Sequence, residues 1–311
     1  MNKIAIATPI GGETGGPEAL HQLCHTIRSF GVDAYLLPWE GTENNKPVDN
    51  YSGYDAPIDL SLAKDTTLIV PETVPELILR GNRSVIWWLS VENSPLAKSK
   101  LFNAGKLEES EDILSSSEFW AKFHSPYLRH CAQSFYARDF VQRVFHTKAK
   151  MLTDYINQND FNDLSRLNEE LVTFSHKGSS YFPFFKDGLN DFNCVQISGM
   201  SKQRAMESLA SSRLYIDLGH QPGRDRLPRE AALSRAHVML NKDGAGAIFK
   251  DAPLSDDYKF NVGDSYAAVE KIRNYLKEKP TPRMSQIVYR NWVKSQESIF
   301  KMEVWKLLKT L

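Results

Sequence analysis

Several features that mark other protein classes are scarce in this 311-residue sequence, and each scarcity excludes a class. The cysteines are only three, Cys24, Cys131 and Cys194, and their wide spacing matches neither a disulfide framework nor a zinc site. No apolar run approaches the roughly 18 residues that a membrane-spanning helix requires. Lysine plus arginine and aspartate plus glutamate both number 38, so no excess of cations supports general nucleic-acid binding.

The remaining composition is that of a globular protein from a reducing compartment. Apolar residues make up 41% and charged residues 24% of the chain, fractions that are typical of soluble domains. The apolar run at the N-terminus is too brief for a secretory signal, so we expect a cytoplasmic protein. Peripheral contact with the inner face of a membrane is compatible with this expectation. His21 and His25 lie four residues apart with the spacing to share a metal, but no third ligand is evident, so we expect no bound metal, and we expect no cofactor.

Strand and helix patterns alternate along both halves of the chain. Ile4–Ile10 is an apolar run that ends in glycines, and a helical pattern over Pro17–Phe30 precedes a second strand at Val32–Leu37. Such a strand, loop, helix and strand open a parallel α/β sheet. The alternation restarts after a polar stretch at 157–170, and Met284–Leu311 is expected to form a long terminal helix.

We therefore predict an α/β protein with two Rossmann-like domains that face a cleft. The domains are residues 1–165 and 166–283, and the helix at 284–311 is expected to pack across both. Ligands of open α/β sheets bind beyond the carboxyl ends of the strands. The loops at these ends therefore hold the candidate site residues.

The segment Leu214–Leu240 carries the most specific pattern in the chain. Its strand at Leu214–Leu218 leads into a loop with two glycines, a proline and two arginines, and Pro228 then suits the first position of a helix. A helix N-terminus beside arginines is well suited to a phosphate group. The alternative interpretation is a solvated loop edge. The candidate phosphate ligands are Arg224, Arg226 and Arg229, and Glu230 lies in the same first helical turn.

Two further residues follow strands of the second half. Lys177 comes after the first of these strands, where its ammonium group would pair with a diphosphate. His220 follows the strand Leu214–Leu218, on the ligand side by the same rule. Lys177 is weak evidence alone, but together with the arginines it predicts an anion clamp.

The loop at residues 11–18, GGETGGPE, lies between the first strand and the first helix. Its glycines would let a substrate approach the backbone closely. Their spacing matches neither the dinucleotide fingerprint nor a P-loop, and a tight turn is the alternative interpretation. The candidate residues for contact with a hydroxylated substrate are Gly12, Glu13, Gly15, Gly16 and Glu18.

The strand at 85–94, VIWWLSVENS, presents Glu92 at its carboxyl end. A carboxylate at this position is a candidate general base that takes a proton from an attacking hydroxyl. The alternative is a glutamate in a solvated loop. Trp87 and Trp88 point to opposite faces of the strand. At least one belongs to the core, and the other would form an aromatic wall against a sugar or base.

Three segments resemble GT-B-type glycosyltransferases, in particular bacterial enzymes of cell-surface polysaccharide assembly. They are GGETGGPEALHQLCHTIRSFGVDAYLL, WWLSVEN and SKQRAMESLASSRLYIDLGHQPGRDRLPREAA, and the likeness extends over most of the chain. The resemblance implies that a nucleotide-diphosphate sugar binds mainly to the C-terminal domain. It also implies that a saccharide or lipid-linked acceptor binds mainly to the N-terminal domain.

The resemblance implies roles for individual residues as well. Glu230 would contact the ribose or sugar of the donor, and Glu92 stands where relatives place a catalytic or sugar-contacting residue. The cations around the loop would neutralise the diphosphate without a metal ion. The family's usual pair of glutamates eight residues apart is incomplete here, because Pro222 occupies the first position.

The leading hypothesis is a metal-independent glycosyltransferase, and two alternatives stand beside it. A NAD-dependent oxidoreductase would explain Glu40, which follows the second strand, although the glycine fingerprint is missing. A non-catalytic relative that binds nucleotides or saccharides would explain Pro222.

Overall fold

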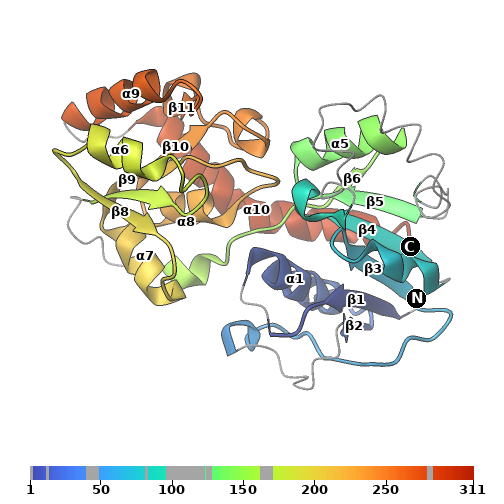
Figure 1. Cartoon of the computed structure of the whole chain (residues 1–311). Helices are drawn as coiled ribbons and strands as arrows, with labels where there is room; N and C mark the ends of the chain where they lie inside the picture. The colour runs from blue at the N-terminus through green and yellow to red at the C-terminus, as the bar shows by residue number, and fades with distance from the viewer. Residues whose placement is uncertain are drawn as a thin grey trace. The chain divides into compact units, whose positions relative to one another are not determined.

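The chain forms two compact units, each of which is an α/β sandwich (Figure 1). The first unit comprises Met1–Asp154 with Ser298–Leu311, and the second comprises Tyr155–Glu297. The sequence had placed this division after residue 165. The computed structural model describes residues 3–11, 14–39, 49–80, 83–95, 123, 128–161, 171–278 and 283–311.

The first unit contains a six-stranded sheet in the order β2-β1-β3-β4-β5-β6, and its described strand pairs are all parallel. The sequences of the strands are near-continuous apolar runs because both faces of a parallel sheet are covered. Their bounds are β1 Ile4–Thr8, β2 Ala34–Pro38, β3 Thr67–Pro71, β4 Ser84–Trp88, β5 Leu128–Ala132 and β6 Lys150–Met151. The helices are α1 Gly15–Ser29 and α5 Phe135–Phe145, with 3₁₀ turns η1 Asp49–Tyr51, η2 Pro75–Arg80 and η3 Val91–Asn93.

The two adjacent tryptophans of β4 show how this sheet is covered. Trp87 is fully buried and stacks on Phe300, with ring centroids 6.3 Å apart. Trp88 is also buried and packs against Phe140 and Phe145 of α5 at 5.4 Å and 5.5 Å. The two side chains do point to opposite faces, but both belong to the core. The prediction of an aromatic wall against a ligand was therefore wrong, because α5 covers that face.

The second unit contains a five-stranded parallel sheet in the order β11-β10-β9-β7-β8. Figure 1 shows α6 and α9 on one side of this sheet and α7 on the other. The strands are β7 Leu171–Ser175, β8 Asn193–Ile197, β9 Ser212–Asp217, β10 His237–Asn241 and β11 Lys259–Phe260. The helices are α6 Phe182–Gly188, α7 Lys202–Ala210, α8 Arg226–Leu233 and α9 Ser265–Lys277, with 3₁₀ turns η5 Gln158–Phe161, η6 Ala245–Ala247 and η7 Asp256–Tyr258.

The long helix α10, Met284–Leu308, begins in the second unit and ends in the first. In the second unit Gln286 bonds both to the N–H and to the C=O of Val238, each at 2.9 Å. In the first unit a carboxylate oxygen of Glu303 accepts hydrogen bonds from the N–H and hydroxyl of Thr153 at 2.7 Å and 2.8 Å. Among the residues that the structure describes, no helix is both long enough and apolar enough to cross a membrane.

Each sheet has one point where the strand order reverses. The reversal lies between β1 and β3 in the first unit and between β7 and β9 in the second. Connections leave such neighbouring strands toward opposite sides, and ligands of open α/β sheets bind there, beyond the carboxyl ends. The glycine-rich loop follows β1, Lys177 follows β7, and the arginine loop follows β9. The predicted site segments thus lie at the two switch points.

Candidate functional site

Glycines allow the loops after β7 and β9 to touch. Gly178 has a φ of +68°, and a Cβ there would lie 2.8 Å from the carbonyl carbon and oxygen of Leu218. A Cβ on Gly219 would lie 2.3 Å from the Cβ of Lys177. Real Cβ atoms do not approach other atoms this closely, so larger residues at either position would force the loops apart. The position of Lys177 is therefore fixed by its contact with the β9 loop.

The loop after β10 joins the same arrangement through Gln221. The N–H of Ala245 donates to the carbonyl of Gln221 at 2.8 Å. A Cβ on Gly244, whose φ is +57°, would lie 2.1 Å from that carbonyl oxygen. Gln221 is buried, and its Nε2 atom has no hydrogen-bond partner among the described residues. An unpaired buried amide is costly unless a ligand or water satisfies it.

Lys177 forms an ion pair with Asp225, and this pair lies at the surface of the second unit. The distance from Nζ to Oδ2 is 2.5 Å, and the side chains are 32% and 17% exposed. Asp225 occupies the N-cap position of α8, yet its side chain makes no capping hydrogen bond. The carboxylate is paired with Lys177 instead. The helix begins at Arg226, two positions before Pro228, where the sequence pattern had placed its start.

Asp217 lies at the end of β9 and is only 1% exposed. Its Oδ1 atom accepts from the N–H of Gly219 at 3.0 Å, and its Oδ2 atom accepts from the Tyr215 hydroxyl at 3.1 Å. Burial, and then the nearby charge of Asp225, raise the pKa of Asp217 to about 7. Burial also raises the pKa of Asp225, and the charge of Lys177 opposes this rise.

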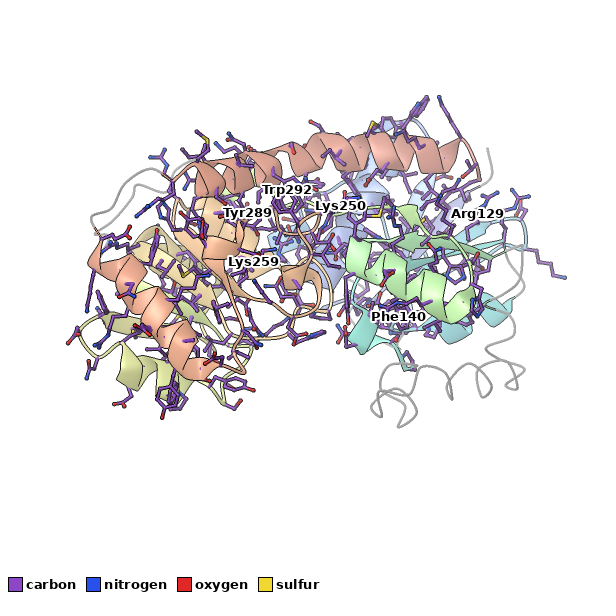
Figure 2. The ribbon with its side chains drawn as sticks, turned by 90° about the horizontal axis from the view of Figure 1, so that it is seen from above. Arg129, Phe140, Lys250, Lys259, Tyr289 and Trp292 are labelled. Carbon is purple, nitrogen blue, oxygen red and sulfur yellow. The ribbon has the colours of Figure 1, made fainter. Side chains whose placement is uncertain are left out.

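Arg224 is a buried structural side chain in the described molecule. Its Nε lies 3.0 Å from Oδ1 of Asp251, and its Nη1 donates to Gln296 of α10 at 3.0 Å. The guanidinium also lies over the ring of Trp292, 5.1 Å from the centroid. In Figure 2, Trp292 and Tyr289 are labelled on α10, and their rings stack with centroids 5.7 Å apart. These contacts fasten the β9 loop to α10.

Arg229 holds the backbone of the same loop. It is 1% exposed, and its Nε and Nη2 atoms donate to the carbonyls of Asp225 and Arg224 at 3.0 Å and 2.6 Å. The guanidinium therefore satisfies carbonyl groups at the start of α8, which need donors when they are buried. Like Arg224, Arg229 stabilises the loop through contacts on its buried side.

Two further basic residues are closer to solvent, and one of them, His220, is charged only when it is protonated. Arg226 Nε lies 3.1 Å from Oε1 of Glu230, one helical turn away, and both side chains are 16% exposed. His220 Nδ1 lies 2.9 Å from Oδ1 of Asp243, with side chains 36% and 51% exposed. Together with Lys177, these residues are the solvent-accessible basic residues of the predicted donor set. The structure thus brings all six predicted donor residues to the carboxyl ends of β7 and β9. Arg224 and Arg229 are buried there, and the other four retain exposed surface.

In the first unit, Glu92 lies on η3 directly after β4. Its Oε1 accepts from the Tyr136 hydroxyl of α5 at 2.5 Å. Glu72 at the end of β3 is buried, and its two oxygens accept from the N–H groups of Leu89 and Ser90 at 2.8 Å and 3.0 Å. This carboxylate therefore holds the turn that carries Glu92.

The glycine-rich loop is described in part, since Gly12 and Glu13 lie outside the described residues. Gly15 and Gly16 are the first two residues of α1. Glu18 is buried in the first turn, where its Oε1 accepts from the Tyr54 hydroxyl at 3.1 Å and from Gln22 at 3.5 Å. A Cβ on Gly16 would meet no atom within 4 Å.

The residues missed by the sequence analysis are the acidic and hydroxyl partners of the predicted ones. Asp217 ends an otherwise apolar strand at its carboxyl end, and that position is a usable signal. Asp225 stands between two arginines in the sequence. Glu72 and Tyr136 are far from Glu92 along the chain and carried no local signal. In the described part of the chain, no three His, Cys, Asp or Glu side chains group as a metal site.

No protein family model and no curated protein matches the sequence. Solved structures do match over the whole chain. Sucrose-phosphate synthase from Thermosynechococcus elongatus has a TM-score of 0.65 at 10% identity, covering 100% of this chain and 99% of its own. The fold is GT-B.

Two further structures of the same kind support this. An α,α-trehalose-phosphate synthase (UDP-forming) from Burkholderia vietnamiensis has a TM-score of 0.59 at 10% identity, with 100% and 99% of the two chains covered. An E. coli trehalose-6-phosphate structure with bound UDP-2-fluoro glucose has a TM-score of 0.60 at 8% identity, with 99% and 98% covered. The predicted pair of Rossmann-like domains of GT-B type is confirmed.

Proposed function

We propose that this protein is a glycosyltransferase that moves a sugar from a nucleoside-diphosphate donor to an acceptor hydroxyl. The observation that carries the proposal is the cation cluster at the β7/β9 switch point of a GT-B fold. The names of similar structures include a UDP-forming synthase and a complex with a UDP-sugar, which supports a nucleotide-linked donor.

In this proposal the donor diphosphate binds beside the N-terminus of α8. Lys177, His220 and Arg226 retain exposed surface and would contact the phosphate oxygens, while the positive end of the helix dipole adds to their field. The buried Arg224 and Arg229 would hold the loop in shape. Glu230 and the unpaired Nε2 of Gln221 are suited to hydroxyl groups of the donor.

The reaction breaks the bond between the anomeric carbon and the diphosphate oxygen, and the acceptor oxygen bonds to that carbon. The electron pair of the broken bond leaves with the nucleoside diphosphate, whose added charge Lys177 and Arg226 would neutralise in place of a metal ion. Glu92 would take the proton of the acceptor hydroxyl. The Tyr136 hydroxyl would orient the carboxylate of Glu92 through their hydrogen bond.

We propose that the acceptor binds to the first unit, near the glycine-rich loop that includes Gly15 and Gly16. A saccharide or lipid-linked hydroxyl of cell-surface polysaccharide assembly would suit a cytoplasmic enzyme that works at a membrane face. The similar structures are named as sucrose-phosphate and trehalose-phosphate synthases, so a sugar phosphate is the competing acceptor class.

Nucleotide binding tests the donor assignment directly. Calorimetry with UDP, GDP, ADP and NAD should reveal binding of one nucleoside diphosphate. Lys177→Ala and Arg226→Ala should each weaken it by about 10- to 100-fold, the effect of one charged hydrogen bond. Arg204→Ala, which removes an exposed arginine of α7, is the matched control and should bind normally. Unchanged affinity in both site variants would refute the assignment, and binding of NAD alone would favour an oxidoreductase.

Turnover is a separate test. Mass spectrometry of reactions with saccharide, lipid-linked and sugar-phosphate acceptors should detect transfer that persists in the presence of a chelator. Glu92→Gln should slow this transfer while leaving donor affinity unchanged. Pro222, which stands at the first position of the family's usual glutamate pair, supports a second candidate, a non-catalytic donor-binding protein. Donor binding without transfer to any acceptor class would favour that candidate.

A further inference from the structure

Most basic side chains of the candidate donor site are already paired with carboxylates of this chain. Four basic side chains pair with acidic side chains at 2.5–3.1 Å, and a bound diphosphate would compete with those acids. When a diphosphate takes the place of a carboxylate beside a basic side chain, that carboxylate loses its partner. The four pairs are Lys177 with Asp225, His220 with Asp243, Arg224 with Asp251, and Arg226 with Glu230.

The pair of Lys177 and Asp225 lies close enough to a second carboxylate, Asp217, for the charges of both residues to act on it. The Lys177 and Asp225 side chains are 32% and 17% exposed, and Asp217 is 1% exposed as a residue. Asp217 accepts hydrogen bonds from two neutral donors, the Gly219 N–H and the Tyr215 hydroxyl. The two acids repel each other electrostatically, and Lys177 is the cation that stabilises both.

We propose that Asp217 and Asp225 form a proton-accepting pair beneath the donor site. When a nucleoside diphosphate binds, the ammonium group of Lys177 turns from Asp225 to the phosphate, and the two carboxyl groups take up a proton from solvent. The proton neutralises the carboxylate that Lys177 has left. This inference rests on the proposed function, because it concerns the site where the donor would bind.

Other charged and titratable groups face this pair from every packed element. Lys177 approaches from the loop after β7, Tyr215 from β9, His220 from the β9 loop, Arg229 from α8 and Tyr289 from α10. Burial raises the pKa values of both tyrosines, so neither exchanges a proton near neutrality. Histidine is the other side-chain type that gains a proton near neutral pH, so His220 requires its own control.

The size of the expected effect follows from electrostatics. One added negative charge at roughly 10 Å, with an effective dielectric constant of about 20, raises a carboxyl pKa by about one unit. Asp217 in the free protein has a pKa of about 7. At about pH 7.5 such a rise corresponds to an uptake of about half a proton per bound nucleotide. Affinity should accordingly fall by about tenfold as the pH is raised from about 6 to about 9.

Calorimetry in buffers of different ionisation enthalpy measures this uptake. UDP, or the nucleoside diphosphate that binds best, is titrated into the full chain at about pH 7.5 in phosphate and in Tris. The wild type should take up about half a proton through the carboxyl pair, Asp217→Asn should lose this share of the uptake, and His220→Gln should keep it. The nucleotide's own phosphate, with a second pKa near 6, contributes equally to all three titrations.

Each outcome decides the proposal. Nucleotide binding without proton uptake in the wild type would overturn the pair while leaving the proposed function intact. Equal uptake by the wild type and by Asp217→Asn would also overturn it. Absence of binding by any nucleoside diphosphate would overturn the proposed function itself. If Asp217→Asn does not fold, Asp225→Asn provides the second variant, and it should reduce the uptake because the like charge beside Asp217 is gone.

Discussion

Two glycines of the second unit permit a controlled test of the loop contact that positions Lys177. Gly178 and Gly199 have φ angles of +68° and +61°, so alanine meets the same left-handed backbone strain at both, about 1–2 kcal/mol. Their surroundings differ, since a Cβ at 178 lies 2.8 Å from the Leu218 backbone and a Cβ at 199 meets no atom within 4 Å. Overpacking against backbone adds about 1–3 kcal/mol. Gly178→Ala should therefore destabilise the second unit by that amount more than Gly199→Ala.

Native-state hydrogen exchange of amides in β7 and β9 reports the opening of the second unit alone. The exchange free energies of the two variants should differ by about 1–3 kcal/mol. Gly178→Ala should also weaken nucleotide binding, because the displaced β9 loop moves Lys177, while Gly199→Ala should bind normally. Equal exchange free energies in the two variants would show that the loops move apart without cost, and the contact would then not fix Lys177.

Three further perturbations probe the buried charges. Glu72→Ala should lower the free energy of unfolding by about 3–5 kcal/mol in urea, because one buried and one half-buried N–H group lose a charged acceptor; a loss below about 1 kcal/mol would contradict this. Arg224→Ala should cost about 3–5 kcal/mol by breaking a buried ion pair, whereas Arg226→Ala should cost at most about 1 kcal/mol because its pair with Glu230 is partly exposed, and equal melting temperatures would refute the contrast. Asp217 binds its proton more tightly in the folded chain, where its pKa is about 7, so its contribution to stability is complete at low pH and should fall by roughly 2–3 kcal/mol between about pH 5 and 8. Asp217→Asn should lack this pH dependence in denaturation curves.

The sequence indicated most of the fold because parallel strands covered on both faces leave long apolar runs. The helix expected over Pro17–Phe30 is observed as α1, Gly15–Ser29, and the strand expected at Leu214–Leu218 is observed as β9, Ser212–Asp217. The start of α8 was misplaced because Pro228 gave a stronger local signal than the N-cap Asp225. Hydrophobic periodicity defines elements well and their ends poorly.

The charge partners within the candidate site could not be predicted in the same way. Arg224 pairs with Asp251 and Gln296, which are 27 and 72 positions away along the chain. Glu72 binds the backbone of Leu89 and Ser90, just before Glu92, and this contact depends on the register of two strands. Local sequence patterns show which residues reach the end of a strand. They do not show which opposite charge the fold brings to that end.

The shared helix α10 has a consequence for the order in which the chain folds during synthesis. Phe300, Val304, Leu307 and Leu308 are buried in the N-terminal unit, although they are encoded at the far end of the chain. That unit therefore lacks part of its core until residues 298–311 have left the ribosome. The second unit needs only residues up to 297. Here the domain that is translated first is the one that completes its folding last, a reversal of the usual vectorial order.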